Sequence, residues 1–301
     1  MNNIPQEQNT QRRLDLLAAQ RQLYSDAKNL QMISVVMSIP VVFAWSTLVA
    51  LFPSLAAYSA LWGMIATLLE LLCFSRLKRT TQDKAAKVQQ IFDCEVLQLN
   101  WIKLNCGIRV DPETIIDAAN RYKQKKHSIA ELQNWYSPSV GKLPIYQARI
   151  ICQRSNIWWD AQLRRRYSKW IIFVLLVLII SVLLIGLVGG LPLEKFLLAV
   201  LAPLTPSFVF GLRQYTENNE SAARLDQLRE NAEILIQEII NGRHTSQDLE
   251  RESHSLQMQI FDNRRRNPLI LDWIYSRLRS EDEEKMNKGA EFLVRELIQN
   301  F

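Results

Sequence analysis

Charged residues are absent from three long stretches of this chain, and their absence limits how the chain can fold. No Asp, Glu, Lys or Arg occurs from Asn29 to Leu69, from Trp170 to Leu193 or from Phe196 to Leu212. A helix needs about 20 apolar residues to cross a bilayer, where no water can satisfy the backbone. The mean hydropathy of -0.07 resembles that of a soluble protein only because it averages over these stretches. A purely soluble globule is therefore excluded.

The charge-poor sequence divides into four segments of membrane-spanning character. The first part holds Ile33–Phe52 and Leu55–Phe74, which are separated by Pro53. Trp170–Leu191 is the third segment, and Phe196–Leu212 is a shorter fourth one. We predict an all-α membrane protein with four transmembrane helices in two hairpins, and with mainly helical cytosolic middle and C-terminal regions.

The positions of Lys and Arg predict the orientation of these hairpins. Basic residues lie before the first and third segments and after the second and fourth: Arg12, Arg13, Arg21 and Lys28; Arg164, Arg165, Arg166 and Lys169; Arg76, Lys78 and Arg79; Arg213. The two short turns carry a single cation between them. Because Lys and Arg are enriched on the cytoplasmic side, we expect both hairpins to enter from the cytoplasm and both termini to be cytoplasmic.

This topology divides the chain into five regions. They are a cytosolic lead helix (1–30), a first transmembrane hairpin (31–75), a basic cytosolic region (76–169), a second transmembrane hairpin (170–212) and a cytosolic helical C-terminal region (213–301). The three cytosolic regions carry net charges of +1, +10 and -4 in chain order. A charge of +10 beside a membrane can set the orientation, attract anionic lipid or bind a phosphorylated ligand.

Capping signals predict several cytosolic helices. Asp111 and Thr245 are typical N-caps, and Pro144 can open a helix that runs directly into the third segment. Pro268 is expected to open a further helix, and the aromatic residues of the C-terminal region are expected in the core. An apolar stripe that ends before Gly242 consists of Leu225, Leu228, Ala232, Leu235 and Ile239. A helix continuous with a span can transmit a movement of the cytosolic part into the bilayer.

No recognised catalytic or metal-binding motif occurs in the sequence. Phosphate-binding glycine loops, HExxH, GxSxG, kinase signatures and zinc-type Cys/His clusters are absent. We therefore expect no enzyme, no cofactor and no metal site, although a triad assembled from distant residues stays open. The histidines are expected to lie on the surface: His127, His244 and His254. The cysteines are expected to be reduced thiols: Cys73, Cys94, Cys106 and Cys152.

Glu70 is the one carboxylate inside an apolar segment. An ionisable group in a membrane helix is by default a functional candidate that faces a bundle interior or water. Its alternative role is an ion pair with Arg76 or Lys78 near the cytosolic end of the segment. Two prolines in the fourth segment remove backbone hydrogen bonds, which suits either a gate or a passive kink. The candidates for a pore or gate are Glu70, Thr67, Pro203 and Pro206.

Arginine and tryptophan are interleaved between Ile151 and Tyr167. Guanidinium groups can bind phosphate and indole rings can stack on a base, as in sites for phosphorylated nucleotides. Tryptophan beside arginine at the entrance of a span is also an ordinary interfacial anchor, which the residues alone favour. The candidates for a cyclic nucleotide site are Arg149, Arg154, Trp158, Trp159, Arg164, Arg165 and Arg166.

Four segments together resemble the SMODS-associated four-transmembrane effector family. They are Leu17–Lys28 in the lead, Ile91–Leu97, Cys152–Tyr167 and Asn267–Tyr275. The likeness covers nearly the whole chain and includes the order of the two hairpins. It implies a pore-forming effector of bacterial antiphage systems, in which a nucleotidyltransferase makes a cyclic oligonucleotide messenger. The effector then opens or disrupts the inner membrane of the infected cell.

The resemblance and the residues together favour a messenger-gated effector in the bacterial inner membrane. Four helices per chain are few for an aqueous pore, so we expect assembly with further copies of the chain. The expected partners are a cyclic oligonucleotide, the lipid bilayer and the chain itself, with a functional link to a nucleotidyltransferase. The alternative is a non-catalytic adaptor or scaffold whose basic cytosolic region binds anionic lipid. A membrane enzyme is the weakest alternative, since no nucleophile or metal site is visible.

Overall fold

The computed structural model describes residues 1–125, 128–188, 190 and 192–299, and all regular structure in these residues is helical. Three helical stretches are long and apolar enough to cross a bilayer: Gln11–Val49, Pro53–Val96 and Ile145–Leu184. The predicted all-α membrane fold is thereby confirmed. The return segment of the second hairpin is not one of these three stretches, so the count of four spans stays a prediction. His127 lies outside the described residues.

The first hairpin has the predicted turn at Pro53 but contains an unpredicted break. Its elements are α2 (Gln11–Ser38), α3 (Pro40–Leu51), a 3-10 turn (Pro53–Leu55), α4 (Ala56–Leu69), a π-helical turn (Glu70–Phe74) and α5 (Ser75–Val96). The break separates α2 from α3 because Pro40 has no N–H to continue the helical ladder. The Ser207 hydroxyl, from the second hairpin, donates to the Ser38 carbonyl at this break.

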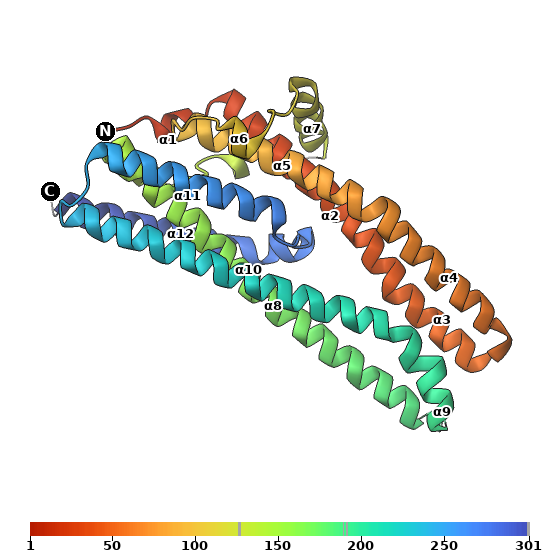
Figure 1. Cartoon of the computed structure of the whole chain (residues 1–301). Helices are drawn as coiled ribbons and strands as arrows, with labels where there is room; N and C mark the ends of the chain where they lie inside the picture. Colours follow the sequence, from red (N-terminus) through yellow and green to blue (C-terminus); the bar gives the residue numbers. More distant parts are fainter. Residues whose placement is uncertain (126–127, 189, 191, 300–301) are drawn as a thin grey trace.

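The third apolar segment continues a helix that begins after Pro144, as predicted. Helix α8 (Ile145–Val188) has 44 residues and is therefore about 66 Å long. The chain returns through α9 (Leu193–Phe196), a π-helical turn (Leu197–Leu201) and α10 (Ala202–Ile240). Figure 1 shows both hairpins at one end of an elongated molecule and both termini at the other. Each hairpin is thus the extension of two helices from the half that contains the termini.

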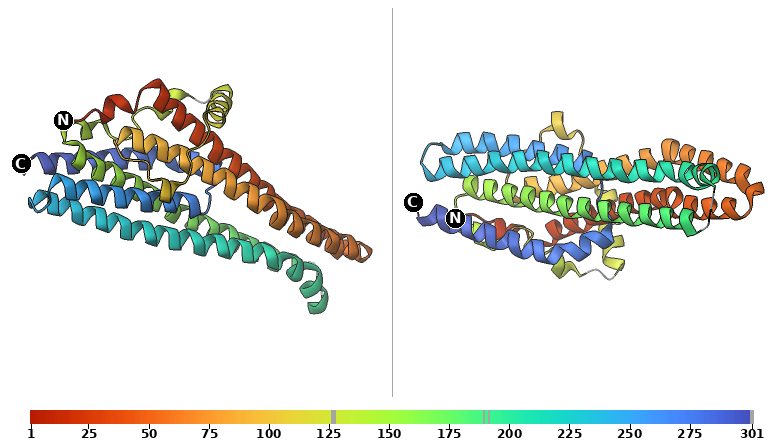
Figure 2. Two further views of the ribbon diagram at one scale, coloured as in Figure 1. Left: turned by 45° about the horizontal axis from the view of Figure 1, so that its top comes forward. Right: turned by 90° about the horizontal axis from the view of Figure 1, so that it is seen from below.

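The remaining helices belong to the half of the molecule that contains both termini. They are α1 (Ile4–Glu7), α6 (Lys103–Cys106), α7 (Pro112–Gln124), α11 (Ser246–Arg266) and α12 (Asp272–Gln299), with 3-10 turns at Ile129–Leu132 and Pro138–Lys142. Helix α2 packs on α5 and α7, whereas α8 packs on α10, α11 and α12. Figure 2 shows α2, α5, α8, α10, α11 and α12 running roughly along the long axis of the molecule. Leu17, Phe92, Ile151 and Ile236 lie in their common core.

Several predicted helix ends are confirmed. The Asp111 carboxylate accepts from the Thr114 N–H, and Thr245 forms a capping box with Asp248. Gly242 ends α10 with a φ of 65°, a conformation that favours glycine. The four cysteines are free thiols, as expected. Burial raises the pKa of the Cys94 thiol to about 12.

The predicted helix start at Pro268 is wrong. Helix α12 begins at Asp272, and it continues without a break through the last amphipathic segment. The preceding residues stay non-helical because side chains of other helices occupy their backbone carbonyls, as described below. The expectation that the C-terminal aromatic residues are core residues is also incorrect for two of them. Trp273 is 49% exposed, with its ring 5.4 Å from that of Trp170, and Phe292 is 67% exposed.

A fully buried carboxylate, Asp93, joins α5 to α11 in the cytosolic core. It forms an ion pair with the Arg264 guanidinium, and it accepts hydrogen bonds from the Tyr136 hydroxyl and the Gln257 amide, both at donor–acceptor distances near the usual values. A buried charge is stable only when it is paired and hydrogen-bonded. Asp93 has both kinds of partner, so it fixes the position of Arg264.

We expect Asp93→Ala to destabilise the protein by about 3 to 5 kcal/mol, because the Arg264 charge would stay buried without its partner. Unfolding in detergent, followed by circular dichroism, measures the loss. Asp117→Ala is the control, since Asp117 forms an exposed ion pair with Arg121. This substitution should lower the free energy of unfolding by less than about 1 kcal/mol. Equal effects of the two substitutions would contradict the structural role of Asp93.

The two hairpins pack against each other inside the membrane region. Val182, Val200 and Leu204 form a buried cluster against which Val42 and Phe43 of α3 pack. Within the second hairpin, a Cβ atom at Gly211 would lie 2.5 Å from a methyl group of Leu175. A larger residue at this position would force the Leu175 side chain to move, so glycine favours the close approach of α8 and α10.

Gly211→Val should disturb the packing of α8 on α10, because the added side chain overlaps Leu175. We expect the free energy of unfolding to fall by about 1 to 3 kcal/mol. Gly63→Val is the matched control, since no atom lies within 4 Å of a Cβ at Gly63. Thermal unfolding of the two variants in detergent checks the difference. A Gly211 variant as stable as the Gly63 variant would show that the two helices do not pack as described.

Candidate functional site

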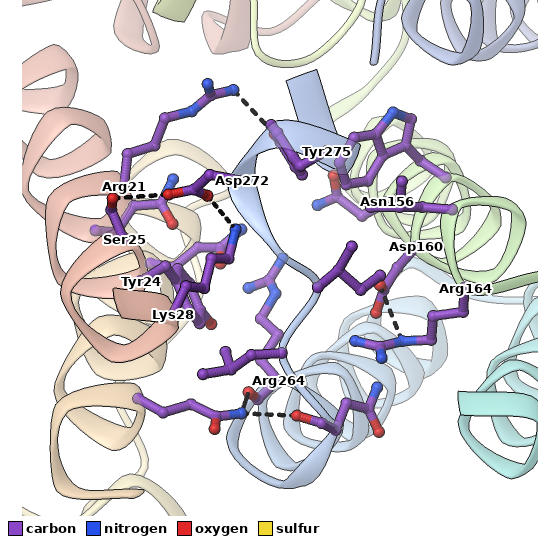
Figure 3. Close-up of a pocket in the computed structure, with 18 of the residues that line it drawn as sticks. Arg21, Tyr24, Ser25, Lys28, Asn156, Asp160, Arg164, Arg264, Asp272 and Tyr275 are labelled. Atoms are coloured by element: carbon purple, nitrogen blue, oxygen red, sulfur yellow. Dashed lines mark hydrogen bonds and ion pairs between the residues drawn. The ribbon is translucent and has the colours of Figure 1, made fainter. Parts of the chain in front are cut away.

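A cavity of about 990 Å³ lies in the half of the molecule that contains both termini, between α2, α8 and the start of α12. Its volume is at the upper end of the range for small-molecule sites. Figure 3 shows the linker before α12, together with the first turn of that helix, running between its two walls. One wall comes from the lead helix and the other from the cytosolic part of α8, so residues far apart in the sequence meet here.

Helical periodicity explains how each wall presents several polar side chains. Arg21, Tyr24, Ser25 and Lys28 are spaced by three or four residues and share one face of α2. On α8, the same spacing brings together the lining residues Asn156, Trp159, Asp160, Leu163 and Arg164. Each wall is therefore one stripe of a long, continuous helix that leads into the membrane segments.

Arg21 lies between aromatic rings. Its Nη2 donates to the Tyr275 hydroxyl at 3.0 Å, and its guanidinium carbon lies 5.3 Å from the Tyr275 ring centre and 5.9 Å from that of Trp135. Cation–π contacts of this kind stabilise a desolvated guanidinium. Within the described part of the chain, no carboxylate forms an ion pair with Arg21. The guanidinium therefore has no carboxylate that a ligand would need to displace.

Lys28 and Asp272 connect α2 to α12 across the cavity. The Lys28 Nζ lies 2.7 Å from the Asp272 carboxylate, which also accepts from the Ser25 hydroxyl at 2.7 Å. Burial lowers the pKa of Lys28, and the ion pair with Asp272 offsets only part of that effect. Burial also raises the pKa of Asp272, but Lys28 and Ser25 outweigh it, so the carboxyl pKa is lowered.

The linker before α12 is held by one side chain from each helix that continues into a hairpin. Gln31 of α2 donates to the Leu269 carbonyl and Gln82 of α5 to the Asn267 carbonyl. Arg164 of α8 donates to the Pro268 carbonyl at 3.0 Å, and Arg224 of α10 donates to the Asn267 side chain. The first three contacts satisfy backbone carbonyls that no helix satisfies, and the fourth holds the Asn267 side chain.

The formal charges of the cavity lining balance. Its basic residues are Arg21, Lys28, Arg164 and Arg264, and its acidic residues are Glu131, Asp160, Asp272 and Glu283. Arg264 is paired with Asp93, and Arg164 is paired with Asp160 at 3.1 Å. Lys28 is paired with Asp272, whose side chain is 48% exposed, so Arg21 is the one cation of the described lining without a carboxylate partner.

Two of the seven predicted nucleotide-site residues line this cavity. Trp159 lies edge-on to Tyr275, with ring centres 5.4 Å apart, and Arg164 is buried. Trp158 is half-buried but is not part of the lining. The structure therefore brings together only part of the Arg and Trp residues that the sequence interleaves.

The other predicted arginines lie outside the cavity lining, and each has a partner within the protein. Arg149 donates to the Leu97 and Gln98 carbonyls at the end of α5, both at 2.6 Å. Three arginines form ion pairs with carboxylates of α10 or α12: Arg154 with Glu233, Arg165 with Asp226 and Arg166 with Asp282. These pairs attach α8 to its neighbouring helices.

The predicted gate residues belong to both hairpins. Glu70 is the first residue of the π-helical turn, accepts from the Ser34 hydroxyl and lies 4.0 Å from the Lys78 ammonium. Thr67 is exposed and donates to the Gly63 carbonyl of its own helix. Pro206 lies inside α10 and is exposed, whereas Pro203 lies in the first turn of that helix. Glu70 thus has the cytosolic ion-pair partner that its position allows.

Several cavity residues escaped the sequence interpretation. They are Arg21, Tyr24, Ser25, Lys28, Arg264, Asp272 and Tyr275. Most lie in Leu17–Lys28 or Asn267–Tyr275, two of the segments that carry the family resemblance. A third such segment, Cys152–Tyr167, supplies the α8 wall, and the fourth, Ile91–Leu97, contains Asp93. The segments that supply the cavity residues could therefore be recognised in the sequence, but only the fold shows that they converge. Among the described residues, no cluster of possible metal ligands occurs.

Comparison with known proteins agrees with this architecture. The model of a family described as "SMODS-associating 4TM effector domain" matches residues 2–293. A protein of Bacillus cereus (strain VD146), named as a probable CBASS effector molecule, is 24% identical over 293 residues, which cover 93% of this chain and 95% of the relative. No solved structure matches the chain. Because the family model spans nearly the whole sequence, the chain belongs to the SMODS-associating 4TM effector family.

Proposed function

We propose that the protein is a membrane effector of antiphage defence, activated by a cyclic oligonucleotide messenger. The messenger binds in the cytosolic part, and the effector then permeabilises the bacterial inner membrane by assembling with further copies of itself. Family membership and the similarity to a probable CBASS effector molecule support this role. A nucleotidyltransferase would supply the messenger. The action is non-enzymatic, in keeping with a family of membrane effector domains.

The observation that carries this proposal is the continuity between the cavity and the hairpins. Helix α8 lines the cavity with Trp159 and Arg164, and the same helix continues through the third apolar segment to Val188. Helices α2, α5 and α10 also contribute residues to the lining and lead toward the hairpins. A ligand that changes how these helices pack in the cytosol therefore acts on the membrane segments directly.

Activation in this proposal is a shift between two states. A ligand can change the balance only by binding one state more tightly than the other. The assembled state would provide the pore, since one chain supplies too few helices to surround water. In this scheme both termini and the regions 1–30, 76–169 and 213–301 lie in the cytoplasm, and 31–75 and 170–212 form the two hairpins. Glu70, Thr67, Pro203 and Pro206 remain the proposed pathway or gate.

The alternative of a lipid-binding scaffold has less support. It requires basic side chains that are available to anionic lipid. Several arginines of the basic region are instead paired with carboxylates of the C-terminal region, as with Arg154, Arg165 and Arg166. The surplus charge of the middle region therefore serves in part to hold α8 against the acidic C-terminal helices.

Purified full-length protein in dye-loaded liposomes should release dye when a matching cyclic di- or trinucleotide is added. Linear nucleotides of the same composition are the control and should cause no release. Chemical crosslinking before and after addition should show larger assemblies only with the active compound. If no cyclic nucleotide of the panel binds or causes leakage, the proposed function is wrong.

A further inference from the structure

The unpaired polar atoms of the cavity wall are all hydrogen-bond donors. Among the described residues of the lining, four buried side-chain atoms have no acceptor: Nε of Arg21, Nε1 of Trp135, Nε1 of Trp159 and Nδ2 of Asn267. The Arg164 Nε lies 3.1 Å from the Asp160 carboxylate and so has a partner. Buried donors in proteins are nearly always paired. Neighbouring protein atoms cover these donors, so a ligand reaches them only when side chains of the lining move, and it then needs acceptors to pair with them.

We propose that a nucleotide-type anion binds in this cavity, with a phosphate on Arg21 and Lys28, and that it displaces Asp272 from Lys28 and so loosens the linker Asn267–Leu271. This inference rests on the proposed function and identifies the site and the contact through which the messenger acts. The linker then serves as a latch, because it joins the cavity to all four helices that enter the hairpins.

Arg21 is suited to a phosphate because it is charged but has no carboxylate partner among the described residues. Its one hydrogen-bond acceptor is the neutral Tyr275 hydroxyl, at 3.0 Å. Hydrogen bonds between a guanidinium and a phosphate are stronger than those between a guanidinium and a neutral oxygen. Exchange of the hydroxyl for a phosphate is therefore favourable, and the Trp135 and Tyr275 rings hold the guanidinium in place meanwhile.

Lys28 is suited to an exchange of partners. Its pKa is lowered by burial, so the single carboxylate of Asp272 compensates its charge incompletely. A phosphate brings more negative charge than a carboxylate and would stabilise the ammonium further. Asp272 is half-exposed, at 48% of its side chain, and it can turn to solvent after the exchange.

Aromatic rings around these cations can receive the bases of the ligand. Trp135, Trp159 and Tyr275 line the cavity, and the indole N–H groups of the two tryptophans have no acceptor in the described protein. A base offers both a π-face for stacking and ring nitrogens or carbonyls as acceptors. Inorganic phosphate would use only the cations, so a nucleotide should bind far more tightly than phosphate alone.

The linker can act as a latch because its restraints come from separate helices. Gln31, Gln82, Arg164 and Arg224 represent α2, α5, α8 and α10 in that order. Asp272 begins α12 directly after the linker and attaches it to α2. Loss of this attachment leaves the four other contacts in place but removes the ion pair to α2, so the linker ties the two hairpins together less firmly.

Binding of cyclic di- and trinucleotides to the full-length protein in detergent tests the site. Arg21→Ala should weaken binding of the active compound at least about tenfold, since it removes a charge-assisted hydrogen bond. Arg12→Ala is the matched control, because Arg12 lies on the same helix but pairs with Glu95 outside the cavity. Arg21→Lys, which keeps the charge, should recover part of the affinity. Unchanged binding in Arg21→Ala would overturn the site while leaving the proposed function intact.

Leakage without ligand tests the latch separately. Asp272→Asn weakens the attachment of α12 to α2, so this variant should release dye from liposomes severalfold faster than wild type when no nucleotide is present. Asp262→Asn is the control, since Asp262 forms an ion pair with Arg266 within α11 and does not contact α2. Basal leakage of Asp272→Asn equal to that of the control would overturn the latch. This result is independent of whether any tested nucleotide is the messenger.

Discussion

Backbone groups cannot remain unpaired in a lipid environment, and the architecture of this protein follows from that constraint. The apolar segments form helices that extend far beyond the apolar stretches, so α8 alone has 44 residues. Core packing, the buried Asp93 pair and the cavity are built on the polar parts of these same helices. The membrane region and the half that contains the cavity are therefore parts of one set of helices.

The charge distribution has a different meaning in the fold than in the sequence. A middle region at +10 beside a C-terminal region at -4 looks like a surface for anionic partners. In the structure, arginines of α8 form ion pairs with acidic residues of α10 and α12. Arg149 donates a hydrogen bond to the Leu97 carbonyl at the end of α5. Much of the complementary charge is thus internal. The positive charge left for a ligand resides in fewer groups, with Arg21 and Lys28 foremost among them.

Features that depend on local sequence were predictable. Charge-free stretches identified the apolar segments, Pro53 marked the first turn, and Asp111, Pro144 and Gly242 marked helix ends. The start of α12 was not predictable from local sequence, because carbonyls near Pro268 are held by side chains more than 100 residues away in the chain. The cavity was only partly predictable for the same reason. Trp159 and Arg164 could be chosen as candidates because arginine and tryptophan are interleaved in their segment. Arg21 could be identified as a cavity residue only from its contacts with aromatic rings in the fold.

The π-helical turn at Glu70–Phe74 sets the rotational phase between the second apolar helix and the cytosol. Such a turn contains one residue more than an α-helical turn, which rotates everything after it by about 100°. The faces of α5 that present Gln82 to the linker and Asp93 to Arg264 therefore depend on a single residue near the membrane boundary. An insertion or deletion there would leave α5 helical but turn its buried face away from α2 and α11. Length in this segment is consequently constrained more tightly than the identity of its apolar residues.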